Sequence, residues 1–243
     1  FDVIHAANPP DTFWAIAAIY KLFGKRYVFD HHDICPELYL ARFGEERRGS
    51  AIHRALGLLE WAQFRTADLV ISTNESYRQV AITRGGMPEG RVVVVRSGPS
   101  RERFATVRPV DEALKRGRRF LVAYLGVMAP QDGVDHLLRA AAVLVRERKR
   151  DDVSFTLIGA GDSFDDLRGL ARELGIQDRV EFTGRIPDAD VERILATADV
   201  CVCPDPRNPL NDVSTMNKVL EYMACGRPIV AYDLREHRFS AGE

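Results

Sequence analysis

The chain has few cysteines, no long apolar run and almost no net charge. Only four of its 243 residues are cysteines, and none forms a Cys-x-x-Cys pair, which argues against a disulfide framework or a cysteine-rich metal site. Cys201 and Cys203 alternate with valines, so we expect small buried thiols on one face of a strand, as in a protein of the reducing cytosol. With 34 basic and 35 acidic residues, the charge gives no case for a nucleic-acid partner. No apolar run is long enough to span a bilayer.

Several catalytic motifs are missing as well. The chain has no Gly-x-Ser-x-Gly elbow and no Walker loop, which argues against a serine hydrolase and a P-loop NTPase. Gly159-Ala160-Gly161 begins like a dinucleotide fingerprint, but Phe164 stands where a third glycine or alanine is needed. We therefore predict a tight turn at the edge of a nucleotide site rather than a nicotinamide or flavin site.

Short apolar runs alternate with longer amphipathic stretches along the whole chain. The predicted strands are Val3–His5, Tyr27–Asp30, Leu69–Ser72, Val92–Val95, Phe120–Leu125, Ser154–Ile158, Val180–Phe182, Val200–Cys203 and Ile229–Tyr232. The predicted helices are Thr12–Phe23, Ser50–Arg65, Glu75–Arg84, Gly133–Glu147, Phe164–Leu174, Asp188–Ala196 and Thr215–Ala224. This alternation predicts an α/β protein with parallel sheets. A stretch with proline, glycine and many charges predicts a linker over residues 101–118, between domains at residues 1–100 and 119–243.

The most informative segment spans residues 214–230. Ser214 or Thr215 suits the N-cap of a helix, whose free amide groups would face an anion. Lys218 adds a positive charge, and Glu221 follows on the same helix face, where it could accept hydrogen bonds from ribose hydroxyls. A capped surface helix would explain the same residues. The polar loop before them, at the end of an apolar strand, favours a nucleotide-sugar site instead.

Two histidines between two aspartates end an apolar strand at residues 30–33. Adjacent side chains of a strand point to opposite faces, so these four cannot converge on one ion, and we predict no metal site. One histidine positioned by an aspartate is the better hypothesis, and a purely structural histidine stays open.

A further polar run follows a strand at residues 72–76. It opens a predicted helix, and an N-cap at Thr73 or Asn74 explains it fully. We therefore assign no chemistry to these residues.

The residues of both halves resemble glycosyltransferase family 4, retaining enzymes of the GT-B fold. The matching pieces of the second half are Tyr124-Leu-Gly126, Gln131-Asp-Gly-Val-Asp-His-Leu-Leu, Leu157-Ile-Gly-Ala-Gly, Val180-Glu-Phe-Thr-Gly, Ala198-Asp-Val-Cys-Val-Cys-Pro and Lys218-Val-Leu-Glu-Tyr-Met-Ala-Cys-Gly-Arg-Pro-Ile-Val. Those of the first half are Phe29-Asp-His-His-Asp, Ala67-Asp-Leu-Val-Ile-Ser and Val95-Arg-Ser-Gly. The resemblance implies two Rossmann-like domains facing across a cleft. The first would be incomplete at its start and the second truncated at its end.

By this resemblance, the parent protein transfers a sugar from a nucleoside diphosphate sugar to an acceptor hydroxyl with retention, in polysaccharide or glycolipid biosynthesis. The implied partners are the nucleotide-sugar donor and a sugar or lipid-linked acceptor, with no metal and no other cofactor. A cytoplasmic location is implied, and a peripheral association with the inner face of the membrane stays open.

The resemblance also assigns roles to single residues. The donor-binding residues would be Gly126, Ser214, Thr215 and Lys218 for the diphosphate, Glu221 for the ribose, and the backbone of Arg185 and Ile186 for the base. His32 matches the histidine that family members place near the transferred sugar.

The chain departs from the family pattern at three positions. Val127 stands where many members have a basic residue, and Asp132 where many have lysine, so Lys218 and helix amides would bear more of the diphosphate. Val213 replaces the first glutamate of the usual Glu-x7-Glu pair, with Asp212 beside it as a substitute catalytic residue.

Because the family's first strand, Gly-rich loop and closing helix are absent, we expect the chain alone to be a poor catalyst. Two alternatives stay open: a binding or scaffold module with a decayed site, and a nucleotide-sugar epimerase on the same fold.

Overall fold

The computed structural model describes residues 1–100 and 109–242. It forms two compact units: unit 1 consists of Phe1–Ser97 and Asn208–Thr215, and unit 2 of Gly98–Arg207 and Met216–Glu243. Residues 101–108 of the expected linker lie outside the described part, and η3 (Glu112–Lys115) forms a short 3-10 helix later in it.

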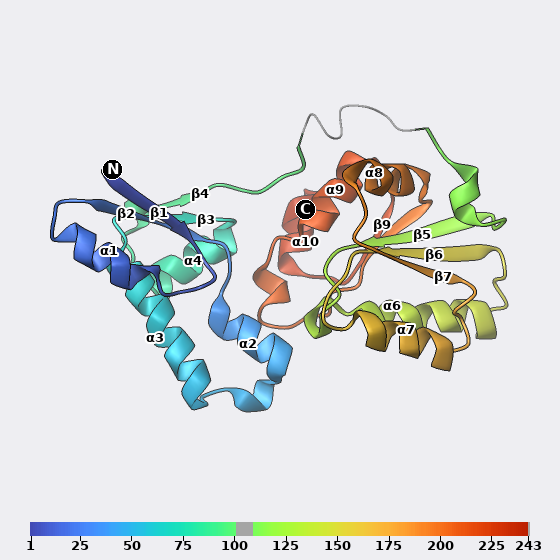
Figure 1. Ribbon diagram of the computed structural model, residues 1–243, viewed down its shortest axis with the longest axis horizontal. Helices are drawn as coiled ribbons and strands as arrows, with labels where there is room; N and C mark the ends of the chain where they lie inside the picture. Colours follow the sequence, from blue (N-terminus) through green and yellow to red (C-terminus); the bar gives the residue numbers. More distant parts are fainter. Residues whose placement is uncertain (101–108, 243) are drawn as a thin grey trace. The chain divides into compact units, whose positions relative to one another are not determined.

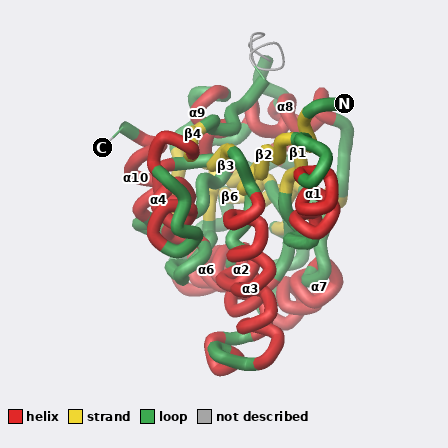
Figure 2. Tube along the Cα trace, turned by 90° about the vertical axis from the view of Figure 1, so that its left-hand side faces the viewer, coloured by secondary structure: helices red, strands yellow, loops and turns green. Residues whose placement is uncertain are grey.

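Unit 1 is built on a four-stranded parallel sheet, with the strands side by side in the order β1-β2-β3-β4 (Figure 2). Its strands are β1 (Val3–Ala7), β2 (Arg26–His31), β3 (Leu69–Ser72) and β4 (Val92–Val94). Its helices are α1 (Phe13–Lys21), α2 (Cys35–Phe43), α3 (Ala51–Thr66) and α4 (Glu75–Thr83), with the 3-10 turns η1 (Glu45–Arg47), η2 (Glu89–Arg91) and η6 (Asn211–Val213).

The core of unit 1 forms where three helices meet one face of this sheet. Ala17 of α1, Phe64 of α3 and Ala81 of α4 pack against Tyr27 and Phe29 of β2, all with at most 1% of their surface exposed. Burial of a phenylalanine side chain contributes roughly 1.5–3 kcal/mol, so these contacts hold the helices to the sheet.

Helix α2 was not expected from the sequence. Pro36 stands in its first turn, where the missing N–H of proline is not needed. The short, highly charged α10 (Arg235–Ala241) was missed as well, because it carries too little apolar periodicity.

Unit 2 contains a five-stranded parallel sheet in the order β7-β6-β5-β8-β9. Its strands are β5 (Phe120–Leu125), β6 (Val153–Ile158), β7 (Val180–Gly184), β8 (Val200–Cys203) and β9 (Ile229–Ala231). The remaining helices are α6 (Val134–Ala142), α7 (Phe164–Glu173), α8 (Asp188–Thr197) and α9 (Asn217–Ala224), with the 3-10 turn η4 (Pro130–Asp132) and the π-helix η5 (Val143–Glu147).

Helices cover both faces of the unit 2 sheet (Figure 1). Leu138 of α6 and Leu167 of α7 pack with Phe155 on one face. Leu195 of α8 and Tyr222 of α9 belong to a second cluster on the other. Two layers of helix around a parallel sheet confirm the prediction of Rossmann-like α/β architecture.

The cysteines and the lengths of the helices were also predicted from the sequence. Cys201 and Cys203 are fully buried on one face of β8, and all four cysteines are free, as predicted for small apolar thiols. Within residues 1–100 and 109–242, no helix has both the length and the apolar character needed to cross a bilayer.

Candidate functional site

Glycines line the carboxyl edge of the unit 2 sheet. β5, β6 and β7 lead into Gly126, Gly159 and Gly184; the Gly126 amide donates to the Ile158 carbonyl at 3.0 Å, and the Gly159 amide donates to the Gly184 carbonyl at 3.0 Å. A Cβ atom on Gly159 would lie 1.9 Å from the carbonyl oxygen of Gly126, and Gly159 has a φ of 126°. Only glycine fits there, so this edge presents bare backbone, as ligand sites of open α/β sheets do.

Lys218 lies beside this edge in a buried ion pair. Its Nζ donates to both carboxylate oxygens of Asp205, at 3.0 and 2.9 Å, and lies 3.8 Å from Oδ1 of Asp132. The ammonium group also stands 5.0 Å from the ring centroid of Tyr124. A Cβ atom on Gly126 would be 3.1 Å from Cε of Lys218, so the structure brings these two predicted residues together.

The charges of this Lys218 cluster (Lys218, Asp132 and Asp205) are strongly coupled. Burial by itself lowers the pKa of Lys218, but Tyr124 and the two carboxylates raise that pKa above its usual range, so the amine stays charged. Burial raises the pKa of Asp132 to about 6, against the opposing effect of Lys218. One cation thus faces two carboxyl groups, and its charge is largely compensated inside the protein.

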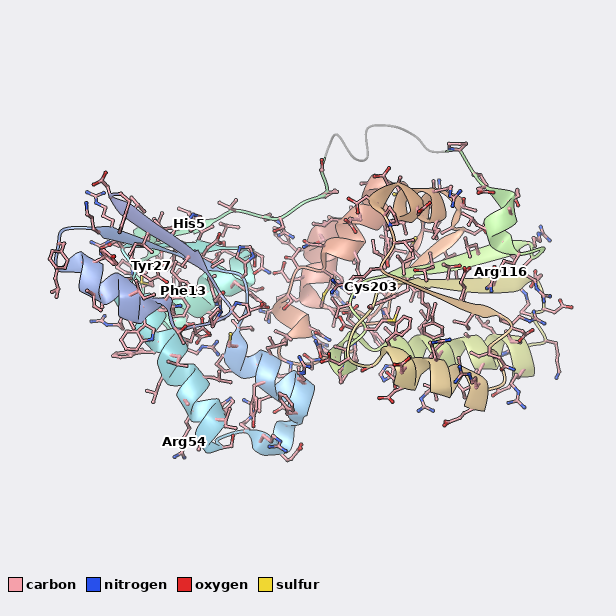
Figure 3. All side chains as sticks on the ribbon, in the orientation of Figure 1. His5, Phe13, Tyr27, Arg54, Arg116 and Cys203 are labelled. Carbon is pink, nitrogen blue, oxygen red and sulfur yellow. The ribbon has the colours of Figure 1, made fainter. Side chains whose placement is uncertain are left out.

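Cys203, labelled in Figure 3, closes the buried side of the same cluster. Its thiol donates to Oδ2 of Asp205 at 2.9 Å, and its Sγ lies 3.5 Å from Nε2 of His237. Burial raises the pKa of the Cys203 thiol far above its usual range. The thiol is therefore a structural hydrogen-bond donor to Asp205 and not a nucleophile.

The expected N-cap at Ser214 or Thr215 is wrong. Helix α9 begins at Asn217, and its N-cap, Met216, makes no side-chain capping bond. The hydroxyls of Ser214 and Thr215 bond to other groups instead of the helix start. The Ser214 hydroxyl donates to the Leu210 carbonyl at 2.8 Å, and the Thr215 hydroxyl accepts from Asn74 at 3.0 Å. These hydroxyls are therefore already engaged within unit 1.

The other candidate residues occupy separate places. Glu221 is half-buried on α9, one turn after Lys218, and Asp212 is half-buried in η6. Arg185 is exposed and Ile186 is half-buried directly after β7. The backbone at Arg185 thus follows the glycine that ends β7, at the carboxyl end of its strand.

His32 follows β2 in unit 1 and is oriented by Asp30. Its Nε2 lies 3.0 Å from Oδ1 of Asp30, while Nε2 of His5, labelled in Figure 3, lies 3.1 Å from Oδ2. The His32 backbone amide donates to Oδ1 of Asn8 at 2.8 Å. Because a carboxylate only accepts hydrogen bonds, we expect the proton of neutral His32 on Nε2, which would leave Nδ1 as an acceptor.

The other histidine of the motif, His31, packs against the rings of Phe29, Phe64 and Tyr77. His31 is fully buried, and burial lowers its pKa to about 3, so it stays neutral. His32 is thus the histidine of the motif that contacts an aspartate.

Sequence reasoning missed Asp205 and the clamp formed by Asn8. Asp205 stands between two prolines at the end of an apolar strand, where a lone carboxylate needs a partner, and that pattern could have indicated it. Asn8 is 24 residues or more away from the loop it holds, and no local pattern reveals such a contact.

Two family models match the chain. One described as Glycosyl transferases group 1 matches residues 119–241, and one described as Glycosyltransferase Family 4 matches residues 1–103. Among curated proteins, the GDP-mannose-dependent alpha-(1-6)-phosphatidylinositol monomannoside mannosyltransferase of Mycolicibacterium smegmatis is 35% identical over 117 residues, covering 47% of this chain and 30% of the relative.

Solved structures share the fold of the chain. HepE from Anabaena, in complex with UDP, has a TM-score of 0.68 at 21% identity and covers 96% of this chain and 60% of its own. WaaG, a glycosyltransferase involved in lipopolysaccharide biosynthesis, has a TM-score of 0.72 at 17% identity, covering 93% of this chain and 65% of its own. The chain spans less than half the length of the curated relatives it matches. The match over more than half of its residues shows that the chain belongs to the group 1 or family 4 glycosyltransferases, with Rossmann-like units of the GT-B type.

Proposed function

We propose that the protein transfers a sugar from a nucleoside diphosphate sugar to an acceptor hydroxyl with retention of configuration. The observation that carries this proposal is the juxtaposition of Gly126 and Lys218 at the glycine-lined edge of the unit 2 sheet. Bare backbone and a nearby ammonium group suit a diphosphate, and Glu221, one helical turn further on, suits a ribose.

Relatives support a nucleotide donor and a glycan or lipid product. HepE was solved with UDP, and the mycobacterial relative is a GDP-mannose-dependent enzyme of a phosphatidylinositol mannoside. WaaG serves lipopolysaccharide biosynthesis. For this chain we propose a uridine or guanosine diphosphate sugar as donor. The acceptor would be a sugar or lipid-linked sugar in polysaccharide or glycolipid biosynthesis, in the cytoplasm or at the inner face of the membrane.

The proposed chemistry is mainly electrostatic. As the diphosphate leaves, negative charge develops on it, and the backbone amides beside Gly126 together with Lys218 would stabilise that charge. The backbone of Arg185 and Ile186 would meet the base. On the acceptor side, the Nδ1 atom of His32 would accept a hydrogen bond from a sugar hydroxyl.

Three residues before helix α9 would also contact the donor. Asp212 would contact the transferred sugar in place of the missing glutamate, and Ser214 and Thr215 would line the diphosphate beside it. Protein donors then carry the charge of the leaving group, so the proposal invokes no metal ion.

Turnover of nucleotide sugars tests the proposal. Release of nucleoside diphosphate is followed for UDP- and GDP-sugars with the wild type, Glu221→Ala and Glu173→Ala, an exposed glutamate of α7. We expect kcat/KM to fall about 100-fold in Glu221→Ala, the loss of about two strong hydrogen bonds, and to stay unchanged in Glu173→Ala. Unchanged turnover in Glu221→Ala would remove this residue from the site.

The compensated charge of Lys218 also favours a second candidate, a binding or scaffold module with a decayed site. Val127 and Asp132 stand where many family members have cations. The remaining cation, Lys218, is already paired with Asp205. Calorimetric titration with UDP and GDP separates the two candidates. No binding of either nucleotide supports the module, and product formed from a donor without acceptor points to an epimerase.

A further inference from the structure

Residues 208–215 contact the start of helix α4 within unit 1. The Asn74 side chain is fully buried and makes three hydrogen bonds. Its Oδ1 accepts from the backbone amide of Tyr77 at 2.7 Å, which caps α4. Its Nδ2 donates to the carbonyl of Val213 at 2.9 Å and to the hydroxyl of Thr215 at 3.0 Å.

Tyr77 holds the same segment through its hydroxyl. The oxygens of Tyr77 and Ser214 are 2.9 Å apart, and Ser214 donates its single hydroxyl proton to the Leu210 carbonyl at 2.8 Å. Tyr77 is therefore the donor to Ser214. Burial raises the pKa of Tyr77 far above its usual range, so this donor keeps its proton at any physiological pH.

Apolar contacts complete the attachment. Leu210, with 6% of its surface exposed, packs with Ile34 and Tyr77, and Val213 packs against the same cluster. The polar contacts are thus partly shielded from water, which strengthens their hydrogen bonds.

We propose that Asn74 and Tyr77 are positioning residues for Asp212, Ser214 and Thr215, three residues to which the proposed function gives a role in the site. The inference rests on that function. Capping of α4 needs only the Oδ1 atom of Asn74, and serine or aspartate would cap equally well. The amide nitrogen serves the 208–215 segment alone, and so does the Tyr77 hydroxyl. These two donors fix the Val213 carbonyl and the hydroxyls of Ser214 and Thr215.

Two substitutions separate this role from the stability of α4. Asn74→Asp keeps the capping oxygen but removes the donor and places a carboxylate against the Val213 carbonyl. Tyr77→Phe removes only the hydroxyl and keeps the ring in its cluster. Thr83→Ala is the control, because this exposed residue of α4 bonds only to the Gln79 carbonyl.

The experiment combines amide hydrogen exchange with kinetics on the full-length parent protein. In Asn74→Asp and in Tyr77→Phe we expect exchange of residues 208–215 to rise at least tenfold, while α4 keeps its protection. With the best donor, kcat should fall about tenfold and the donor KM should change less. Thr83→Ala should match the wild type in both measurements.

The outcomes separate the inference from the function on which it rests. Unchanged exchange of residues 208–215 would overturn the inference, and so would raised exchange with unchanged kcat in an active enzyme. Loss of α4 protection in both variants would reduce the two residues to a structural role. A folded wild type that turns over no donor would refute the proposed function itself, and the inference with it.

Discussion

The ammonium group of Lys218 and the carboxylate of Asp205 form a buried two-point ion pair, with Nζ–O distances of 3.0 and 2.9 Å. The side chains are only 10% and 1% exposed. A lysine that the sequence assigns to a diphosphate thus already has a protein counter-charge. Any contribution of Lys218 to the donor site has to be weighed against its contribution to stability.

Removal of Lys218 should destabilise the fold. In Lys218→Ala, the Asp205 carboxylate remains buried without its partner, and we expect a loss of about 3–5 kcal/mol in the free energy of unfolding. Chemical denaturation measures it. Lys25→Ala is the control, because its partner Asp2 is 95% exposed and such a pair contributes at most about 1 kcal/mol. A loss below about 1 kcal/mol in Lys218→Ala would mean that Asp205 is compensated elsewhere.

Asp132 should make stability depend on pH. Its pKa in the folded protein is about 6, above the value of about 4 for an unfolded chain, so the folded state binds the proton more tightly. The stabilisation is fully present below pH about 4 and is lost as the pH rises through about 6. Asp132→Asn resembles the protonated form and can still accept from the Ala129 amide.

Unfolding curves at pH 4 and pH 8 check this expectation. Asp132→Asn should equal the wild type at pH 4 and exceed it at pH 8 by up to about 3 kcal/mol, the free energy equivalent of that pKa difference. Equal stability of the two proteins at both values of pH would show that the carboxyl of Asp132 titrates normally.

Asp30 should fix the tautomer of His32. Nitrogen NMR of the histidine rings should show the proton of neutral His32 on Nε2, because Asp30 accepts at that atom. Asp30→Asn should weaken this preference, since the amide can also donate. His5→Ala leaves the Asp30–His32 contact in place and should preserve the wild-type tautomer. A proton on Nδ1 in the wild type would contradict the assignment.

Gly159 should tolerate no side chain. In Gly159→Ala the new Cβ would lie 1.9 Å from the Gly126 carbonyl, at a φ of 126° that other residues rarely adopt. We expect a loss of about 3 kcal/mol or more. Gly169→Ala is the matched control: this glycine of α7 has open space around its Cβ, and alanine should stabilise the helix by about 1 kcal/mol. Similar effects of both changes on the thermal midpoint would refute the close packing of the glycine turns.

The sequence predicts the sheets well and the site only in part. Short apolar runs mark the nine strands of residues 1–100 and 109–242, because the apolar side chains of a strand leave a local signal. The start of α9 was misplaced, because Ser214 and Thr215 have the chemistry of capping residues but bond to Asn74 and Tyr77, far away in the chain. Such contacts are decided by tertiary packing.

Ion pairs between residues close in sequence can also be predicted, whereas those set by tertiary packing cannot. The pairing of His32 with Asp30 follows from the period of a strand, which places residues two apart on one face. The pairing of Lys218 with Asp205 joins a helix to a strand end, and no spacing in the sequence reports it.

Analysis of the transferred sugar tests the central claim most directly. The protein is incubated with UDP- and GDP-sugars and candidate sugar acceptors, and the anomeric configuration of the product is read by NMR. The proposed function predicts transfer from one donor class into a glycosidic bond with the same configuration as in the donor. A product of inverted configuration, or no transfer from any donor by the folded protein, would contradict it.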